Sequence, residues 1–549
     1  MRRGYVNIGS AVEPRRIHFR AAGAGPPLIM LHASPMSSAA MVPLMLALAD
    51  RATVIAPDTP GYGQSDPLGM PGDDLLPYID ALDRFRSGLG ITKAGFYGTA
   101  TGAQIAIEYA KTCTEHVACL ILDNAADFTD DDREAIVHDY FPDLSVEDNG
   151  AHLMRLWAVA RDLMLFFPWH RREPEHRLAQ GAISAAASHA MARCYLEAGP
   201  DYDRAYRAAF NNEKKERLLG VTAPTTIMRW EGSILKPYTD RFDEMPWPEH
   251  FHMQHCGPAM EDRLAGLQSA VDSSLMSAGL ETVGAGTLGD RAGDFRFVDT
   301  AAGQLHLREA GAGKPLLLLH DLGESGQALS GHVEIMSAAR WVLVPDLPGH
   351  GQSLVPGDGD YLEQAAAALA QMLDERSVEQ CDVMAWGRSA AIGGLLGKRV
   401  SRLVLINPVD GPALASQVDL KRETADLEPA ADGSHLVKIW AMLYQRQLFH
   451  PWYQAEPGQA LPGQPAVDGA TLNQRLLERI WSAGALAEAL ASVGLVSLNQ
   501  AMAEFDGTCK WFLVSDDPLA EISRQTCGKR PWRELPVKPG GWLRAAGLI

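Results

Sequence analysis

Short, nearly continuous hydrophobic runs alternate along the chain with longer stretches in which hydrophobic residues recur at helical spacing. The first half contains four such runs, at residues 28–31, 53–56, 94–97 and 118–122. This alternation predicts a mostly parallel β-sheet with helices on both faces. Long insertions at residues 130–220 and 411–506 carry Trp, Phe and Leu at helical spacing, which predicts a helical lid in each half of the chain.

The second half of the chain repeats the first. Two blocks recur at an offset of 288 residues and two more at an offset of 283 residues: 20–32 with 308–320, 56–65 with 344–353, 152–157 with 435–440, and 166–169 with 449–452. Repeats of this length are whole domains, each with its own core. The sequence therefore predicts a tandem duplication.

Domain boundaries follow from the repeat and from a glycine-rich segment between the copies. A chain of 549 residues is also too long for one core. We expect domain 1 at residues 1–273, a linker at 274–294 with five glycines and few large hydrophobic residues, and domain 2 at 295–549.

Charge and composition narrow the classes of partner. The net charge is −19 and no Lys/Arg-rich block occurs, which argues against nucleic-acid or anionic-membrane binding. No apolar run reaches the length of a membrane span, and no signal-peptide core follows the N-terminus, so we expect a cytoplasmic protein. Seven scattered cysteines and the absence of a Gly-x-Gly-x-x-Gly turn indicate neither a metal nor a cofactor. The sequence leaves open whether the protein forms a homo-oligomer.

Several motifs resemble the α/β-hydrolase superfamily, and the likeness covers nearly the whole chain twice. They are the strand ending in Leu31-His32, the segment Pro57-Asp58-x-Pro60-Gly61-x-Gly63-x-Ser65, and a Gly-x-x-x-Gly turn. The resemblance implies two tandem α/β-hydrolase domains, each a mostly parallel sheet flanked by helices with a helical lid insertion. It also implies a small hydrophobic compound as substrate or ligand.

In this family a sharp turn of the form small-x-nucleophile-x-small holds the nucleophile. In copy one the turn is Gly98-Thr99-Ala100-Thr101-Gly102, so the nucleophile position is Ala100, whose methyl group cannot attack a substrate. In copy two the turn is expected at residues 387–391, which makes Ser389 the candidate nucleophile.

A nucleophilic serine needs a base and an acid that orients the base. In copy one the resemblance implies His255 as base, with Glu231 or Asp123 as acid. In copy two it implies Asp517 as acid, but Gly541 or Trp542 stands where the base belongs. A lid residue, His450, is a more distant source of a base, as is His255 acting from the other copy.

The resemblance also implies the backbone donors of an oxyanion hole. They are Ala33 and Thr101 in copy one, and Asp321 and Ala390 in copy two. A carboxylate at Asp321 would repel an oxyanion unless it is protonated or turned away. Asp58 and Asp346 precede proline-containing turns and are interpreted as structural turn residues.

Two functions remain open from the sequence. The first is a hydrolase of ester, acyl or carbon–carbon bonds in small hydrophobic compounds, working through an atypical set of catalytic residues. The second is a pseudo-hydrolase that binds a small ligand without turnover, because each copy lacks a member of the triad. The sequence also leaves open whether Ala100 is natural or a deliberate replacement of the nucleophile.

Overall fold

The computed structural model divides the chain into two compact units. Unit 1 comprises Met1–Ser145 and Arg155–Ala292, and unit 2 comprises Val146–Met154 and Gly293–Ile549. The structure describes residues 1–10, 13–69, 74–178, 182–424, 427–462, 465, 467–536 and 538–548. Parts of both predicted lids, at residues 179–181, 425–426, 463–464 and 466, lie outside the described residues.

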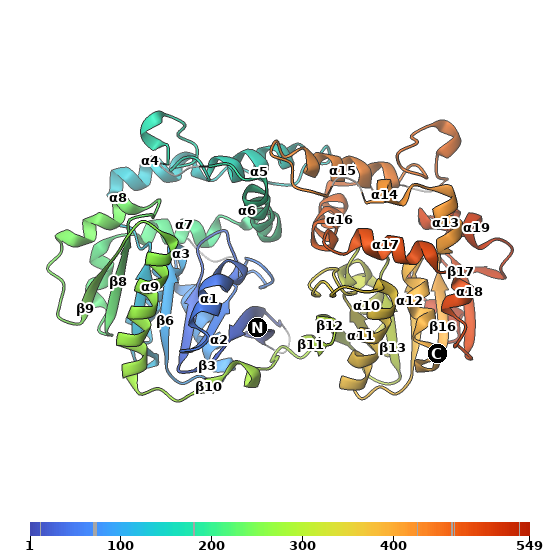
Figure 1. Cartoon of the computed structure of the whole chain (residues 1–549), viewed down its shortest axis with the longest axis horizontal. Helices are drawn as coiled ribbons and strands as arrows, with labels where there is room; N and C mark the ends of the chain where they lie inside the picture. The colour runs from blue at the N-terminus through green and yellow to red at the C-terminus, as the bar shows by residue number, and fades with distance from the viewer. Residues whose placement is uncertain are drawn as a thin grey trace. The chain divides into compact units, whose positions relative to one another are not determined.

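Unit 1 is built on an eight-stranded sheet with the order β1-β2-β5-β4-β6-β7-β8-β9 (Figure 1). The β1–β2 and β2–β5 pairs are antiparallel, and all later pairs are parallel. The strands are β1 (Arg2–Asn7), β2 (Arg16–Ala22), β4 (Pro27–Leu31), β5 (Thr53–Pro57), β6 (Ala94–Thr99), β7 (Val117–Asp123), β8 (Thr225–Trp230) and β9 (Phe251–Cys256).

Unit 2 repeats this topology in an eight-stranded sheet of order β11-β12-β14-β13-β15-β16-β17-β18. The two orders correspond position by position, which confirms the tandem duplication and the predicted fold class. The strands are β11 (Phe295–Thr300), β12 (Gly303–Ala310), β13 (Pro315–Leu319), β14 (Trp341–Pro345), β15 (Cys381–Trp386), β16 (Val400–Ile406), β17 (Thr508–Leu513) and β18 (Trp532–Glu534).

The central strands are hydrophobic on both sides because helices cover both faces of the sheet. Every residue of β4, β5, β6 and β7 is buried. Helices α1 (Val42–Leu48), α2 (Leu76–Gly88), α3 (Thr101–Thr112) and α9 (Met260–Ala270) flank the sheet of unit 1 (Figure 1). Among the described residues, no helix is both long and apolar enough to span a membrane.

Each unit contains a helical insertion between two consecutive strands of its sheet, at the place where the sequence predicts one. Between β7 and β8 it carries α4 (Asp130–Tyr140), α5 (Ala151–Asp162), α6 (Ala185–Ala198) and α7 (Arg204–Asn212). Between β16 and β17 it carries α13 (Gly411–Gln417), α14 (Leu420–Glu423), α15 (Ser434–Arg446), α16 (Gly469–Ser482), α17 (Leu486–Leu495) and α18 (Leu498–Ala501).

The glycine-rich segment predicted as a linker forms regular contacts with unit 1. Its short strand β10 (Val283–Gly284) pairs with β3 (Ala24–Gly25). The Tyr5 N–H donates to the Asp290 carboxylate at 2.8 Å, and the Arg291 N–H donates to the Tyr5 carbonyl at 2.7 Å. The segment predicted as a linker therefore pairs with the backbone of β1 and β3, which its glycine content does not reveal.

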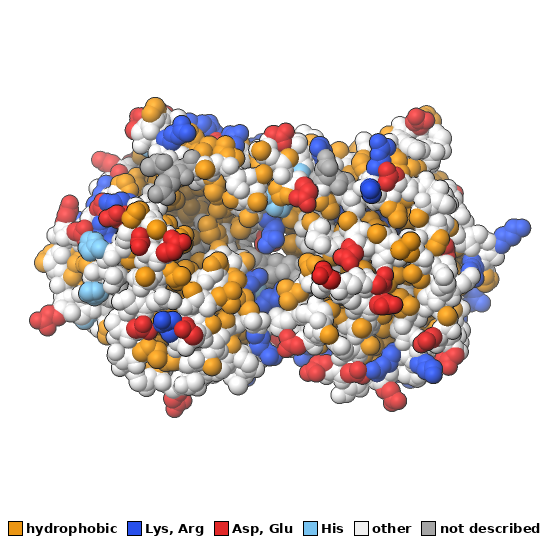
Figure 2. Space-filling model, in the orientation of Figure 1, with side chains coloured by type: hydrophobic (Ala, Val, Ile, Leu, Met, Phe, Trp, Pro, Cys, Tyr) orange, Lys and Arg blue, Asp and Glu red, His pale blue; other side chains and the backbone are white. Residues whose placement is uncertain are grey.

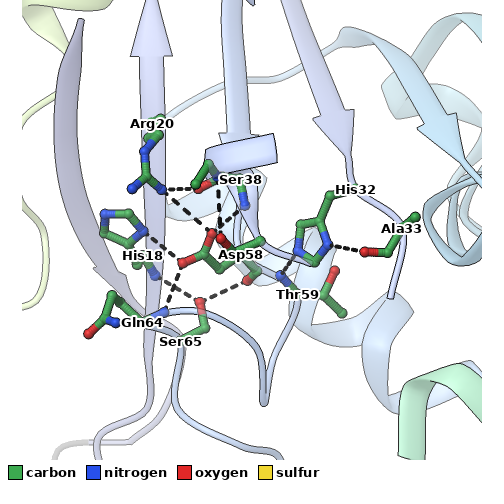
Figure 3. Close-up of polar contacts among 11 residues, drawn as sticks. His18, Arg20, His32, Ala33, Ser38, Asp58, Thr59, Gln64 and Ser65 are labelled. Carbon is green, nitrogen blue, oxygen red and sulfur yellow. Dashed lines mark hydrogen bonds and ion pairs between the residues drawn. The ribbon is translucent and has the colours of Figure 1, made fainter. Parts of the chain in front are cut away.

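A buried carboxylate, Asp58, ties three segments of unit 1 together (Figure 3). It contacts His18 Nδ1 of β2 at 2.8 Å, and it accepts hydrogen bonds from the backbone N–H groups of Ser38 and Gln64 at 2.7 and 2.9 Å. Burial opposes ionisation, but the contact with His18 holds the pKa of Asp58 below its ordinary value. Asp58 is therefore a structural residue, as its position before a turn indicated.

Unit 2 contains the same arrangement around Asp346. Its carboxylate contacts His306 Nδ1 at 2.9 Å and accepts from the N–H groups of Gly326 and Gln352 at 2.7 and 2.8 Å. Burial opposes the shift, but His306 lowers the pKa of Asp346 to about 2.

A second pair of imidazoles repeats in the same way. His32 contacts the Ala33 carbonyl at 3.0 Å and accepts from the Thr59 N–H at 2.9 Å. His320 contacts the Asp321 carbonyl at 2.9 Å and accepts from the Leu347 N–H at 3.0 Å. Each imidazole therefore joins the loop after one strand to the loop after the next.

Removal of the Asp58 carboxylate is expected to destabilise unit 1. Asp58→Ala leaves His18 and two buried N–H groups without their acceptor, so the free energy of unfolding should fall by about 3–5 kcal/mol. Differential scanning calorimetry measures the change, with Glu281→Ala, at an exposed position, as the control. A loss no larger than that of the control would contradict a structural role for Asp58.

Candidate functional site

The turn between β6 and α3 has the geometry of a strained strand-to-helix elbow. Ala100 lies between the last residue of β6 and the first residue of α3, with φ 47° and ψ −116°. A non-glycine residue rarely adopts positive φ, and such strain collects at functional sites. Gly98 and Gly102 permit the turn, because an added Cβ at either position would meet backbone atoms of Gly102 or Leu31.

A cavity of about 840 Å³ opens at this elbow and lies within unit 1. Ala33, Ala100 and Thr101 line it, so both proposed oxyanion donors of copy one face the same space as the elbow residue. The N–H of Thr101 belongs to the first turn of α3, where a helix leaves its N–H groups without internal acceptors. In Figure 2, hydrophobic side chains gather around a hollow between the helical insertion and the sheet of this unit.

His255, the expected base of copy one, does not reach the cavity. It lies within β9, its side chain is 66% exposed, and its Nε2 is 3.8 Å from the Asp243 carboxylate. No histidine is among the described residues that line the cavity. The assignment of His255 is corrected because the imidazole belongs to an exposed position of the strand itself and is not among the residues that line the cavity.

The two acid candidates of copy one differ in position. Glu231 follows β8 as expected and lines the cavity. Asp123 ends β7 but is buried in an ion pair with Arg263 at 2.7 Å, and it accepts a hydrogen bond from Tyr97 Oη at 2.8 Å. Asp123 is absent from the cavity lining, although Arg263 is part of it. The carboxylate of Asp123 thus neutralises Arg263 and orients no base.

In unit 2 the elbow lies two residues earlier than the sequence predicted. Strand pairing aligns Ala385 with Gly98, because each lies opposite the last residue of the equivalent strand, β13 or β4. The elbow residue is therefore Gly387, with φ 55°, and it corresponds to Ala100. Ser389 corresponds to Gly102 instead, two residues after the elbow residue and directly before α12 (Ala390–Leu395).

Ser389 is fully buried, and its hydroxyl lies 3.0 Å from the Leu319 carbonyl and 2.8 Å from the Trp386 carbonyl. A serine whose proton is held by backbone carbonyls has no base and no access to a substrate. The prediction that Ser389 is a nucleophile is corrected on this geometry. The fully buried Ala390 is likewise displaced, since the residue that follows the elbow is Arg388.

The position of an oxyanion in unit 2 is filled by a carboxylate of the protein itself. Asp321, the equivalent of Ala33, accepts from the Arg388 N–H at 2.7 Å and from its guanidinium at 2.6 Å. A Cβ on Gly387 would lie 2.5 Å from Asp321 Oδ1, so no side chain fits at the elbow. The repulsion expected from Asp321 is absent in this arrangement, because Arg388 pairs with it.

The remaining candidates of unit 2 are separated from the elbow by their own contacts. Asp517 follows β17 as expected, but its carboxylate accepts from the Leu519 N–H at 2.8 Å, and burial raises its pKa to about 6. Trp542, where a base belongs, is buried and stacks on Trp386 with ring centroids 6.2 Å apart. Burial lowers the pKa of His450 to about 4. No contact among the described residues joins any of them to Ser389.

Glu213 is a carboxyl of the cavity that the sequence did not single out. It follows α7, it is 5% exposed, and it lines the cavity with Tyr140 and Tyr206. Burial raises the pKa of Glu213 well above its ordinary value. The sequence Asn211-Asn212-Glu213 at the end of α7 matches no functional motif. The carboxyl reaches the apolar cavity because of the position of α7, which the sequence does not reveal.

Comparison with known proteins agrees with this architecture. Residues 26–231 match the family model described as alpha/beta hydrolase fold. A soluble epoxide hydrolase from Corynebacterium sp. (strain C12) is 37% identical over 95 residues, which are 17% of this chain and 33% of that protein. Haloalkane dehalogenase 2 from Mycobacterium tuberculosis is 30% identical over 110 residues, which are 20% and 38% of the two chains. The matches span about a third of each relative.

Solved structures of similar fold each cover about half of the chain. A thermophilic esterase from Thermogutta terrifontis shares 16% identity, with 51% of this chain and 99% of that chain covered and a TM-score of 0.37. An esterase from Exiguobacterium antarcticum shares 18% identity, with 50% and 99% covered and a TM-score of 0.37. Because the family model matches residues 26–231 and unit 2 repeats the strand order of unit 1, the chain contains the α/β-hydrolase fold twice in tandem.

Proposed function

We propose that unit 1 binds a small, largely hydrophobic compound in the cavity at Ala100, and that the chain acts as a pseudo-hydrolase. The observation that carries the proposal is a cavity of about 840 Å³ beside the elbow, without a nucleophile at Ala100 and without a histidine among its described lining residues. Pockets of this size enclose ligands of drug-like dimensions. Loss of triad members removes most of the catalytic rate while binding persists.

The filled site of unit 2 also supports the proposal that the ligand binds in unit 1. Its elbow residue is Gly387, the space beside it holds Asp321, and Arg388 pairs with that carboxylate. A site whose anion position is filled by its own side chain has no room for a tetrahedral intermediate. The proposed ligand therefore binds in unit 1.

A second candidate function is hydrolysis of an ester, acyl or carbon–carbon bond in unit 1 by an atypical set of residues. The strained backbone at Ala100 favours it, since this geometry serves to present a nucleophile. Glu231 at the cavity is the carboxylate available to polarise a water molecule. The named relatives, an epoxide hydrolase and a haloalkane dehalogenase, are hydrolases.

A fluorophosphonate that traps activated serines tests the absence of an activated serine, on which the pseudo-hydrolase proposal depends. We expect no adduct on the parent chain and none on Ala100→Ser, because no described imidazole lines the cavity to take the proton. Intact-mass spectrometry with peptide mapping gives the readout, and an active serine hydrolase labelled alongside is the control. An adduct on Ser389, or at position 100 of the variant, would refute the pseudo-hydrolase proposal.

Filling the cavity should remove binding of a neutral hydrophobic dye such as N-phenyl-1-naphthylamine. Ala209 lines the cavity from α7, and Ala209→Leu places a larger side chain there, so we expect the dissociation constant to rise by about tenfold or more. Fluorescence titration measures it. Ala190→Trp, on an exposed position of α6, is the control, and thermal unfolding verifies that both variants fold. Unchanged dye binding by Ala209→Leu would exclude this cavity as the site.

A further inference from the structure

Glu213 places an unpaired carboxyl in the wall of the cavity. Its side chain is buried, and no hydrogen bond or ion pair of its carboxyl is observed among the described residues. The backbone carbonyl of Glu213 accepts from the Phe128 N–H at 3.0 Å, which fixes the segment after α7 against the sheet. A buried carboxyl without a partner is unfavourable, so its presence here calls for an occupant of the cavity.

Three aromatic rings line the same cavity as this carboxyl. Tyr206 and Phe210 stack with centroids 5.4 Å apart, and Tyr140 meets the Phe210 ring edge-on at 5.3 Å. The Tyr140 and Tyr206 hydroxyls lie 3.0 Å apart. Burial first, and the nearby Glu213 carboxyl to a smaller extent, raise the pKa of both tyrosines. All these rings line the cavity.

Among the described residues, no basic side chain forms an ion pair with Glu213. Five nearby cations have acidic partners of their own: Arg207 with Asp203, Lys214 with Asp130, Lys215 with Asp127, Arg241 with Asp132, and Arg263 with Asp123. Gln104 of α3 accepts a hydrogen bond from the Asn212 side chain of α7 at 3.1 Å. Tyr140 is the polar residue that α4 contributes to the cavity lining, and its hydroxyl contacts Tyr206. Glu231 is the other carboxyl in the cavity lining.

An ammonium group satisfies both features of this wall. It forms an ion pair with a buried carboxylate, and the faces of aromatic rings attract it within about 6 Å of their centroids. A neutral apolar ligand would leave the carboxyl unpaired, and a carboxylate ligand would be repelled once Glu213 ionised. The hydrophobic remainder of the cavity holds the carbon skeleton of the same molecule.

We propose that Glu213 makes unit 1 selective for hydrophobic amines, whose ammonium group pairs with the Glu213 carboxylate against Tyr140, Tyr206 and Phe210. The proposal rests on the proposed binding function of unit 1 and names the class of its ligand. Glu213 is a specificity-determining residue in this account.

The test compares phenylbutylamine, phenylbutanol and phenylbutanone by isothermal titration calorimetry. The parent chain should bind the amine about tenfold or more tightly than the alcohol or the ketone. Glu213→Gln keeps the shape of the side chain and removes its charge, so it should abolish the preference and leave the alcohol affinity unchanged. Glu216→Gln, at an exposed position three residues further on, is the matched control and should retain the preference.

Proton release gives a second readout that a merely structural carboxyl would not produce. Burial raises the pKa of Glu213, whereas an ammonium ion beside the carboxylate favours its ionised form, so amine binding should be accompanied by proton release. Titration in two buffers of different ionisation enthalpy should show release of up to one proton on amine binding at neutral pH. Amine affinity should rise with pH until the free carboxyl is ionised. Glu213→Gln should show neither effect.

The outcomes separate this inference from the proposed function. Equal affinities for the three compounds, a preference for the ketone, or retention of the amine preference by Glu213→Gln would each overturn the role of Glu213. Loss of the preference in Glu231→Gln instead of Glu213→Gln would do the same. Failure of the three compounds and of the neutral dye to bind would refute the binding function itself.

Discussion

The backbone constraint at the end of β6 governs the site in both units. In unit 1 an alanine is held at φ 47°, a conformation that L-residues disfavour, because Gly98 and Gly102 pack the turn against the backbone of β4. The strain keeps the start of α3 directed at the cavity. In unit 2 glycine occupies the same position without strain, and the space that a side chain would need is taken by Asp321. One turn thus gives an open site in the first copy and a filled one in the second.

The two copies share the buried polar contacts that hold their loops and differ at the elbow. The carboxylates of Asp58 and Asp346 make the same set of contacts with an imidazole and two backbone N–H groups, and His32 and His320 connect equivalent loops. These interactions fix the loops that follow the central strands, irrespective of any ligand. The copies differ at the elbow, at the residues that face it and in their helical insertions, while the strand order and the contacts of these buried groups persist.

The polar groups of unit 1 lie at two places in one apolar cavity. Near the elbow, Arg263 is neutralised by Asp123 and provides no free positive charge. At the end of α7, Glu213 has no charge partner among the described residues, and it shares the cavity lining with the stacked rings of Tyr206 and Phe210. Burying a carboxyl without a partner costs free energy during folding. A ligand that pairs with this carboxyl offsets that cost, so an unpaired group in an apolar cavity has a large effect on which ligand binds. This contrast directs the proposed function toward binding selectivity and away from triad chemistry.

Sequence alone determined the duplication through its repeated blocks, and the parallel sheets and helical insertions through local periodicity, while the turn at Ala100 was implied by the resemblance to α/β-hydrolases. Tertiary structure decided the residues of the site. A pattern of small-x-Ser-x-small matched Ser389 two residues out of register, and only strand pairing identified Gly387 as the elbow. His255 points outward because alternate residues of a strand face opposite ways. The Asp123–Arg263 pair and the exposure of Glu213 to the cavity join residues far apart in the chain, where no sequence pattern records which groups will meet.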